Sequence, residues 1–328
     1  MYENLYLLGE YMNYCEFQSY ICDRVKERLG EDYTISIYSV LKNNSLELEA
    51  LMIQSKTENI CPTIYLEKYY GDYCNGSTID EIVDAILALY DSAREQTPSM
   101  DMNYFAFEDV KSQIYFRLIN NKKNKQLLQN VPHKKYLDLA ITFHCLVEAN
   151  PEGIKSFMIS DHLMQLWNAD VDELYQLAKE NTPRLFPLKV NTMEEVLESL
   201  LYGPKAYENM DIVEKQNIVT SSMQKTVEDT SINADMTLLV ATNQMGTNGA
   251  AVIFYPDFLA KIAKKYQKNL ILLPSSIHEF LILPEDEDCC EDYLTNMVLE
   301  VNRTEVATED ILSDHIYYYD WLEDKLRC

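Results

Sequence analysis

Two serines, a histidine and a glutamate lie close together in the stretch LLPSSIHEFLILP, residues 272–284. A serine hydroxyl becomes a nucleophile when a histidine accepts its proton and a carboxylate orients that histidine. Ser276 and His278 are two positions apart, so in an extended chain their side chains point to the same side. Asp314 is an acid that could complete such a relay. The pattern therefore allows a hydrolase whose site opens at the bend from Pro274 to Glu279.

The same stretch also has a structural interpretation. If it is a strand, His278 shares one face with Phe280 and Ile282, and Glu279 shares the other face with Leu281 and Leu283. Both faces are then apolar, which predicts a central strand that is covered on both sides. His278 and Glu279 diverge, which argues against one metal ion bound by both. We favour a structural role for this stretch, in which its polar side chains bond to loop backbone and fix the turn after Pro274. These side chains are Ser275, Ser276, His278 and Glu279.

Other sequence signals of chemistry are absent or weak. The chain contains no GxGxxG, no GxxxxGK[ST], no HExxH, no paired CxxC and no GxSxG. The segment EDEDCCED, residues 285–292, combines carboxylates with thiols, but adjacent cysteines are poorly spaced for chelation. We interpret that segment as a charged surface loop. The sequence therefore predicts no metal and no cofactor, and it leaves open whether the protein is an enzyme.

The chain has a formal net charge of −25. Such a surface repels phosphate backbones and anionic membranes, which argues against direct nucleic-acid binding and membrane association. The charge either serves solubility or forms a carboxylate array that imitates nucleic acid and inhibits a nucleic-acid-binding enzyme. The one concentrated basic run, NKKNKQLLQNVPHKK, could hold an acidic partner, although a solvated turn is the commoner explanation. Seven of the 24 tyrosines lie in two short segments, 65–73 and 317–319, and could form either a binding face or half-buried structure.

The N-terminal residues and the cysteines suggest in which cellular compartment the protein is found. The first residues lack a basic region followed by a continuous apolar run, which is what a signal peptide requires. The apolar stretches have the length of strands rather than of membrane spans. The eight cysteines show no paired spacing and are expected to be reduced thiols. We therefore expect a cytoplasmic protein with no membrane segment.

Local patterns predict an irregular alternation of helices and strands. A helix should end at Gly30, a hairpin should turn at Asn43-Asn44 with Glu47 and Glu49 on its solvent face, and Thr78 to Glu81 should form a capping box. CPTIYLEKYYGDYCNGS should be extended, and the helix VDELYQLAKENT should stop before Pro183. MTLLVATN and GAAVIFYP should form a hairpin, and Asp257 should cap the next helix. We predict an α+β fold of mixed or antiparallel sheets with hairpins and packed amphipathic helices.

Composition divides the chain into four expected parts. Residues 1–100 should form a helix-hairpin-helix α+β part, and residues 101–202 a middle α+β part. Residues 203–235 are polar and should be a helical or linker segment. Residues 236–328 should form a C-terminal α+β part.

Several segments together resemble a known family. They are KNN at residues 42–44, PTIYLEKYY, FRLINNKKNKQLL before a D-L-A-I strand, VATN, NGAAVIFYP, LLPSSIHEFLILP and EVNRTEVATEDILSDHIYYYD. The chain resembles domain of unknown function 5688, which is found mainly in anaerobic Gram-positive bacteria, from about Phe17 to Asp320. The resemblance implies a bacterial cytoplasmic protein and supplies no activity. The family usually has glycine where this chain has Ser45, a residue that tolerates a positive φ less easily.

Taken together, these patterns favour a non-enzymatic protein that binds another protein in a regulatory or accessory role. This expectation rests on the missing catalytic motifs, the negative charge and the tyrosine-rich segments. The hydrolase at the Pro274–Glu279 bend and the acidic nucleic-acid mimic are the alternatives. The sequence does not identify the partner or the oligomeric state.

Overall fold

The computed structural model describes residues 12–56, 62–96, 106–150, 153–202, 238–286 and 289–328. The chain divides into two compact units, of which the first comprises residues 1–42 and 46–105 and the second comprises residues 43–45 and 106–328. The parts expected at 101–202 and 236–328 both fall almost wholly in the second unit. The helical or linker segment expected at 203–235 lies outside the described residues.

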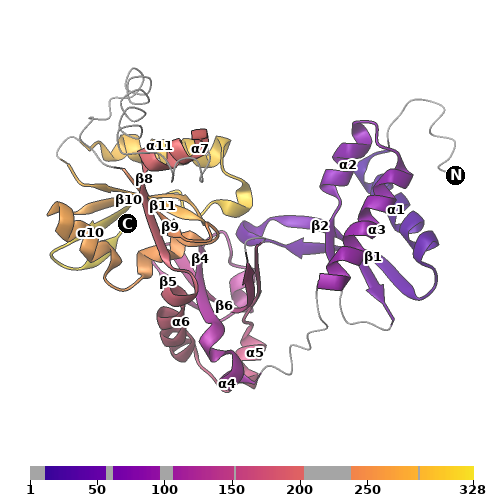
Figure 1. The fold of residues 1–328 in the computed structure, drawn as a ribbon, viewed down its shortest axis with the longest axis horizontal. Helices are drawn as coiled ribbons and strands as arrows, with labels where there is room; N and C mark the ends of the chain where they lie inside the picture. The colour runs from indigo at the N-terminus through magenta and orange to yellow at the C-terminus, as the bar shows by residue number, and fades with distance from the viewer. Residues whose placement is uncertain (1–11, 57–61, 97–105, 151–152, 203–237, 287–288) are drawn as a thin grey trace. The chain divides into compact units, whose positions relative to one another are not determined.

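The first unit is a three-stranded antiparallel sheet with helices on one face (Figure 1). Asn13 and Glu16 form a capping box at the start of the first helix, and Gly30, with φ of 82°, ends it as expected. The capping box from Thr78 to Glu81 is also confirmed. The elements are α1 (Tyr14–Leu29), β1 (Tyr33–Leu41), β2 (Glu47–Ser55), β3 (Thr63–Tyr65), α2 (Glu67–Cys74) and α3 (Ile79–Gln96).

The helices of this unit cover the face of β2 that carries the glutamates. Leu51 and Ile53 pack into the core with residues of α1 and α3, and Glu49 lies on the same face. Its carboxylate accepts a hydrogen bond of 2.6 Å from Gln18 of α1. Glu47 and Glu49 are both exposed, as expected. The face that they share is nevertheless the one that the helices cover at Leu51 and Ile53, so the expectation of an uncovered face is wrong. The alternation of charged and apolar residues at the start of β2 therefore did not predict which face of the sheet the helices cover.

The segment after β3 also differs from its expected form. In its described part, from Pro62 on, the segment CPTIYLEKYYGDYCNGS forms a strand at Thr63–Tyr65 and then the helix α2. Tyr73 of this helix is buried, and its ring lies 5.4 Å from that of Phe17. Packing against the first helix has thus overridden the strand preference of the tyrosines.

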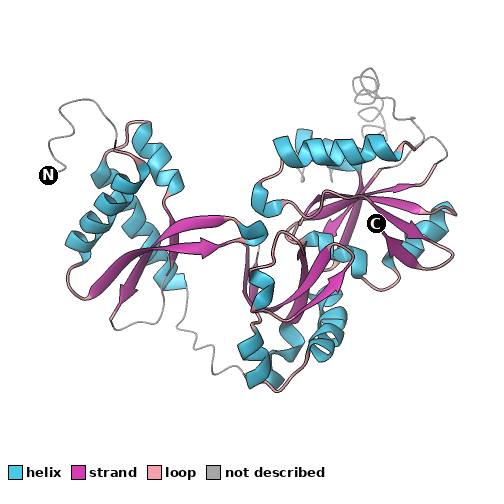
Figure 2. Cartoon of the chain, turned by 180° about the vertical axis from the view of Figure 1, so that it is seen from behind, coloured by secondary structure: helices cyan, strands magenta, loops and turns pink. Residues whose placement is uncertain are grey.

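The second unit contains two sheets, and all its described strand pairs are antiparallel (Figure 2). In one sheet β6 pairs with β4, β5 and β7. The other sheet has six strands in the order β13-β12-β10-β11-β9-β8. The strands are β4 (Ile114–Asn120), β5 (His133–Tyr136), β6 (Leu139–Asn150), β7 (Gly153–Met158), β8 (Leu188–Thr192), β9 (Leu239–Asn243), β10 (Leu270–Ser276), β11 (Glu279–Pro284), β12 (Tyr317–Asp320) and β13 (Lys325–Arg327). The antiparallel α+β fold is confirmed.

One apolar core joins the two sheets of this unit. Phe116 and Phe143 of the smaller sheet and Leu272, Phe280 and Ile282 of the larger sheet belong to it, together with residues of three helices. A second cluster covers the other face of the six-stranded sheet beneath α11. The helices are α4 (Phe107–Val110), η4 (Lys111–Gln113), η5 (Leu127–Gln129), α5 (Asp161–Leu166), α6 (Val171–Leu185), α7 (Met193–Tyr202), η6 (Gly249–Phe254), α10 (Phe258–Tyr266), α11 (Glu291–Thr304) and η7 (Thr308–Asp310). The expectation of a central strand covered on both sides is confirmed for Glu279–Pro284, whereas His278, which was expected in the strand, lies in the turn before it.

Three local expectations in this unit are wrong. The segment GAAVIFYP is not a strand but the 3₁₀-helix η6, because β9 pairs with β11 and β8 and has no free edge for it. The helix α6 continues through Pro183 to Leu185. Asp257 precedes α10 with φ of 58° and makes no side-chain cap. None of the described helices is long and apolar enough to cross a membrane.

The turn Asn43–Ser45 (η2) belongs to the second unit. Asn44 and Ser45 both have positive φ values, 59° and 56°. The Ser45 hydroxyl donates to the carbonyl of Lys123 at 2.6 Å, and the Asn44 amide donates to the carbonyl of Ile311 at 2.7 Å. These bonds stabilise a left-handed conformation that serine adopts less readily than glycine.

Candidate functional site

The bend between β10 and β11 is a two-residue turn, Ile277-His278, at the end of an antiparallel pair. The N–H of Ile277 donates to the carbonyl of Asp310 at 2.8 Å, and its carbonyl accepts from Ala250 at 3.1 Å. The His278 carbonyl accepts a bond of 2.8 Å from Thr242 Oγ1. The turn is therefore tied by its backbone to β9, η6 and η7.

Both ring nitrogens of His278 have partners. Nδ1 accepts from the backbone N–H of Asn248 at 3.0 Å, and Nε2 lies 3.3 Å from Asp310 Oδ1. Because Nδ1 acts as an acceptor, the hydrogen belongs on Nε2, where it can face the carboxylate. The ring is about one-third exposed, at 34%. His278 is thus held between a backbone donor and an acid, and that acid is Asp310.

The other candidates of the bend have separate partners. Ser276 Oγ accepts from the backbone N–H of His278 at 3.0 Å, and Ser275 donates to Glu279 Oε1 at 3.2 Å. Asp314 bonds instead to Lys123, at 3.1 Å, and to Asn302, at 2.9 Å. The structure therefore brings Ser276 and His278 together through backbone and places Asp314 in another cluster. Ser276 and His278 thus bond to backbone at the turn, as the structural interpretation expects, whereas Ser275 and Glu279 bond to each other.

Asp314 belongs to a polar cluster built by several of the segments that carry the family resemblance. Asp138, from the D-L-A-I segment, accepts from Ser313 at 2.6 Å and from Tyr317 at 2.7 Å. Burial raises the pKa of Tyr317, and the nearby carboxylate of Asp138 adds to that shift. Asn302 also donates to the carbonyl of Ser313, at 2.9 Å. Each buried polar group here has a partner, which is typical of a structural network.

Among the described residues, the basic run at 122–135 is only partly paired with acids. Lys123 pairs with Asp314 and Lys134 with Asp172. Within the described part of the chain, no three His, Cys, Asp or Glu side chains lie close enough to hold a metal ion.

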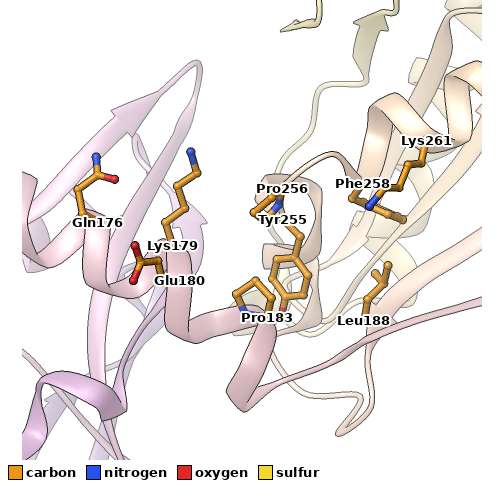
Figure 3. Close-up of a pocket in the computed structure, with 9 residues that line it drawn as sticks. All are labelled: Gln176, Lys179, Glu180, Pro183, Leu188, Tyr255, Pro256, Phe258 and Lys261. Carbon is orange, nitrogen blue, oxygen red and sulfur yellow. The ribbon is translucent and has the colours of Figure 1, made fainter.

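A pocket of about 520 Å³ lies elsewhere in the second unit, between α6, α10 and the start of β8 (Figure 3). The uncharged residues of its lining are Gln176 and Pro183 of α6, Leu188 of β8, Tyr255 and Pro256 after η6, and Phe258 of α10. Tyr255 is buried and donates to the carbonyl of Phe186 at 2.6 Å. Burial raises the pKa of Tyr255. A phenol held in this way forms a rigid, neutral wall.

Two lysines line the pocket from opposite sides. Figure 3 shows Lys179, from α6, on one side and Lys261, from α10, on the other. Glu180 is the one acid in the lining. Both lysines are exposed, and neither forms an ion pair with a carboxylate of the described chain. The lining therefore has a local positive balance in a strongly acidic protein.

A second, much smaller cavity of about 10 Å³ lies beside Arg117, Thr182 and Asn248. Its volume corresponds to about one water molecule. It is too small to receive a ligand.

The strand β8 is an edge of the six-stranded sheet, since in the described structure it pairs only with β9. Gln244 donates to the carbonyl of Pro187, and Met193 donates to the carbonyl of Leu238, each at 2.9 Å. In an antiparallel ladder, bonding groups alternate along the strand. The N–H and C=O groups of Leu188 and Val190 therefore point away from β9, toward the open edge. Both residues are 37% exposed.

Sequence reasoning missed this pocket and this edge. Their residues come from separate segments, and none is unusual by itself. One signal was present, because FPLKVNT alternates apolar Leu188 and Val190 with polar residues after the helix. That pattern could have predicted β8 but not its position at the edge.

The fold defines the class of protein: a two-unit antiparallel α+β protein with an open-edged six-stranded sheet. The comparison with protein families is more specific. The model of the family of unknown function DUF5688 matches residues 14–321, so the chain belongs to that family. Neither the curated proteins nor the solved structures contain a match to this chain.

Proposed function

We propose that this protein acts in the bacterial cytoplasm by binding another protein, in a regulatory or accessory role, through the free edge of β8. The observation that carries the proposal is the row of backbone groups at Leu188 and Val190, which have no strand partner among the described residues. An extended segment of a partner can add to such an edge as a further strand. The backbone bonds supply affinity, and alternate side chains supply selectivity.

In the part of the chain that the structure describes, the edge has little of the protection that proteins usually give to such strands. Prolines, bulges, inward charges and covering loops keep most edges from pairing with other chains. Within β8 the one charged residue is Lys189, and two apolar side chains beside it are exposed. Each new backbone hydrogen bond contributes about 0.5–1.5 kcal/mol net. An added strand that bonds to Leu188 and Val190 would form up to about four such bonds.

The alternatives have less support. A nucleic-acid mimic needs uninterrupted rows of carboxylates, whereas Asp80 and Asp84 of α3 pair with Arg24 and Arg28 of α1. A hydrolase at the bend needs a His278 ring nitrogen that accepts from the Ser276 hydroxyl, whereas Nδ1 accepts from Asn248 and Nε2 faces Asp310. Both stay predictions of the sequence, and the edge of β8 is the stronger basis for a function.

The test is an affinity capture from a lysate of the native host with wild type, Val190→Pro, Val190→Thr and His278→Ala. Proline removes the outward N–H of residue 190 and leaves the pairing with β9 intact, since prolines are tolerated where the N–H faces solvent. Threonine keeps the N–H and the strand preference. We expect one stoichiometric partner with wild type, Val190→Thr and His278→Ala, and its loss with Val190→Pro.

Recovery of the same partner by Val190→Pro, in a variant whose far-ultraviolet circular dichroism matches wild type, would contradict binding at β8. Loss of the partner only with a folded His278→Ala would move the interface to the β10–β11 bend.

A further inference from the structure

We infer that the segment added at β8 is acidic and that the pocket between α6 and α10 binds one of its carboxylate side chains. This inference rests on the proposed function. The pocket and the edge share Leu188, which lines the pocket and also presents its backbone to the open side of β8. The two features are therefore one continuous binding surface.

The geometry of the sheet decides which side chains of an added strand reach the pocket. Leu188 and Val190 lie opposite Asn243 and Ala241, so these side chains share one face of the sheet. Ala241 belongs to the core between the two sheets, which is the side of η6 and α10. A strand added about 4.8 Å from β8 places every second side chain on that side. Its side chain next to Leu188 then points toward the pocket.

The charges of the lining select the chemistry of that side chain. Lys179 and Lys261 present ammonium groups from opposite sides, and neither has a carboxylate partner in the described part of the chain. With Glu180, the pocket lining carries one net positive charge. A carboxylate between two ammonium groups forms charge-assisted hydrogen bonds. Its methylene groups can pack on Phe258 and Tyr255 below, as is usual in pockets of this size.

The sign of this pocket also serves selectivity. With a net charge of −25, the protein repels most acidic chains at long range. An acidic segment is held only where its carboxylate meets Lys179 and Lys261 while its backbone meets β8. Neutral and basic strands would lack the lysine contact, and free anions would lack the backbone contact.

The test selects random displayed peptides on the wild-type full chain and measures the binding of the enriched peptides by fluorescence anisotropy. We expect enriched peptides with one Asp or Glu flanked by β-branched or aromatic residues. Reversal of both pocket charges, in Lys179→Glu/Lys261→Glu, should lower their affinity about tenfold or more, since charge-assisted bonds are lost and repulsion replaces them. Lys264→Glu is the control, because Lys264 lies on α10 with Lys261 but outside the pocket lining. It should change the affinity by no more than about twofold.

Two further probes separate this inference from the proposed function. Val190→Pro should abolish peptide binding. A peptide with N-methyl groups on alternate residues should also fail to bind wild type, and this probe does not depend on the folding of a variant.

Peptides that depend on the β8 backbone but show no acidic preference and no response to the pocket lysines would overturn the inference and leave the proposed function standing. An absence of any peptide sensitive to Val190→Pro or to N-methylation would overturn both. Binding of free glutarate with equal affinity to wild type and Val190→Pro would identify a small-anion site and overturn the inference.

Discussion

Gly249 lies where η6 passes close to β9 and to the bend between β10 and β11. A Cβ atom at this position would lie 2.1 Å from Thr242 Oγ1, 2.5 Å from the carbonyl oxygen of His278 and 2.8 Å from the backbone nitrogen of Asn243. Two of these three atoms are backbone atoms of a sheet or a tied turn, so they cannot rotate away. Gly249→Ala therefore requires η6 or the strands to shift.

The expected cost follows from these contacts. Overpacking a well-packed site costs about 1–3 kcal/mol and sometimes more. The Thr242–His278 hydrogen bond, at 2.8 Å, lies in the way of the new methyl group, and its loss adds about 1 kcal/mol. We expect Gly249→Ala to lower the free energy of unfolding by about 3 kcal/mol or more, which corresponds to a decrease in Tm of roughly 10 °C for a unit of this size.

The assay is urea unfolding followed by far-ultraviolet circular dichroism, with Gly71→Ala as the matched control. Gly71 lies within α2, and a Cβ there would meet no atom within 4 Å. Alanine in a helix is favoured over glycine by about 0.5–1 kcal/mol, so the control should keep or raise stability. Adding Thr242→Ala to Gly249→Ala should recover only part of the loss, because the backbone contacts persist. A loss below about 1 kcal/mol for Gly249→Ala would refute the reasoning.

Two further predictions concern the candidates at the bend and in the polar cluster. His278→Ala leaves the N–H of Asn248 without its acceptor and should cost about 1–3 kcal/mol in urea unfolding, whereas His278→Asn offers an amide oxygen and should cost less; equal losses would contradict a structural role. Burial by itself raises the pKa of Asp314, but the hydrogen bonds from Lys123 and Asn302 together outweigh that effect. The pKa of Asp314 therefore lies below its ordinary value of 3.8. The lowered pKa stabilises the folded state at pH values above 3.8, and this gain is lost as the pH falls below 3.8 and through the lowered pKa of the folded state. Asp314→Asn should therefore lose less stability than wild type as the pH falls below about 4, and an equally steep loss in the variant would show that Asp314 is not responsible.

Local signals in the sequence predicted most of the elements. The helix that ends at Gly30 and the strands on either side of Ile277-His278 follow from residues that are neighbours in the chain. Capping groups and two-sided apolar alternation act over a few positions, so they can be identified without knowledge of the fold.

Tertiary structure decided what the elements do. GAAVIF has the composition of a strand, but the places beside β9 are taken by β8 and β11, so it forms a helix against them. The acid beside His278 is Asp310 rather than Asp314, because the segment after α11 brings the former to the bend and the latter to Lys123.

The pocket and the open edge likewise exist only after α6, β8 and α10 have come together. The sequence by itself determined an acidic α+β chain with a tied turn at LLPSSIHEFLILP and the family resemblance. The order of strands in the sheet, and therefore which strand is left at the edge, depends on contacts between residues far apart in the chain, which no local pattern encodes.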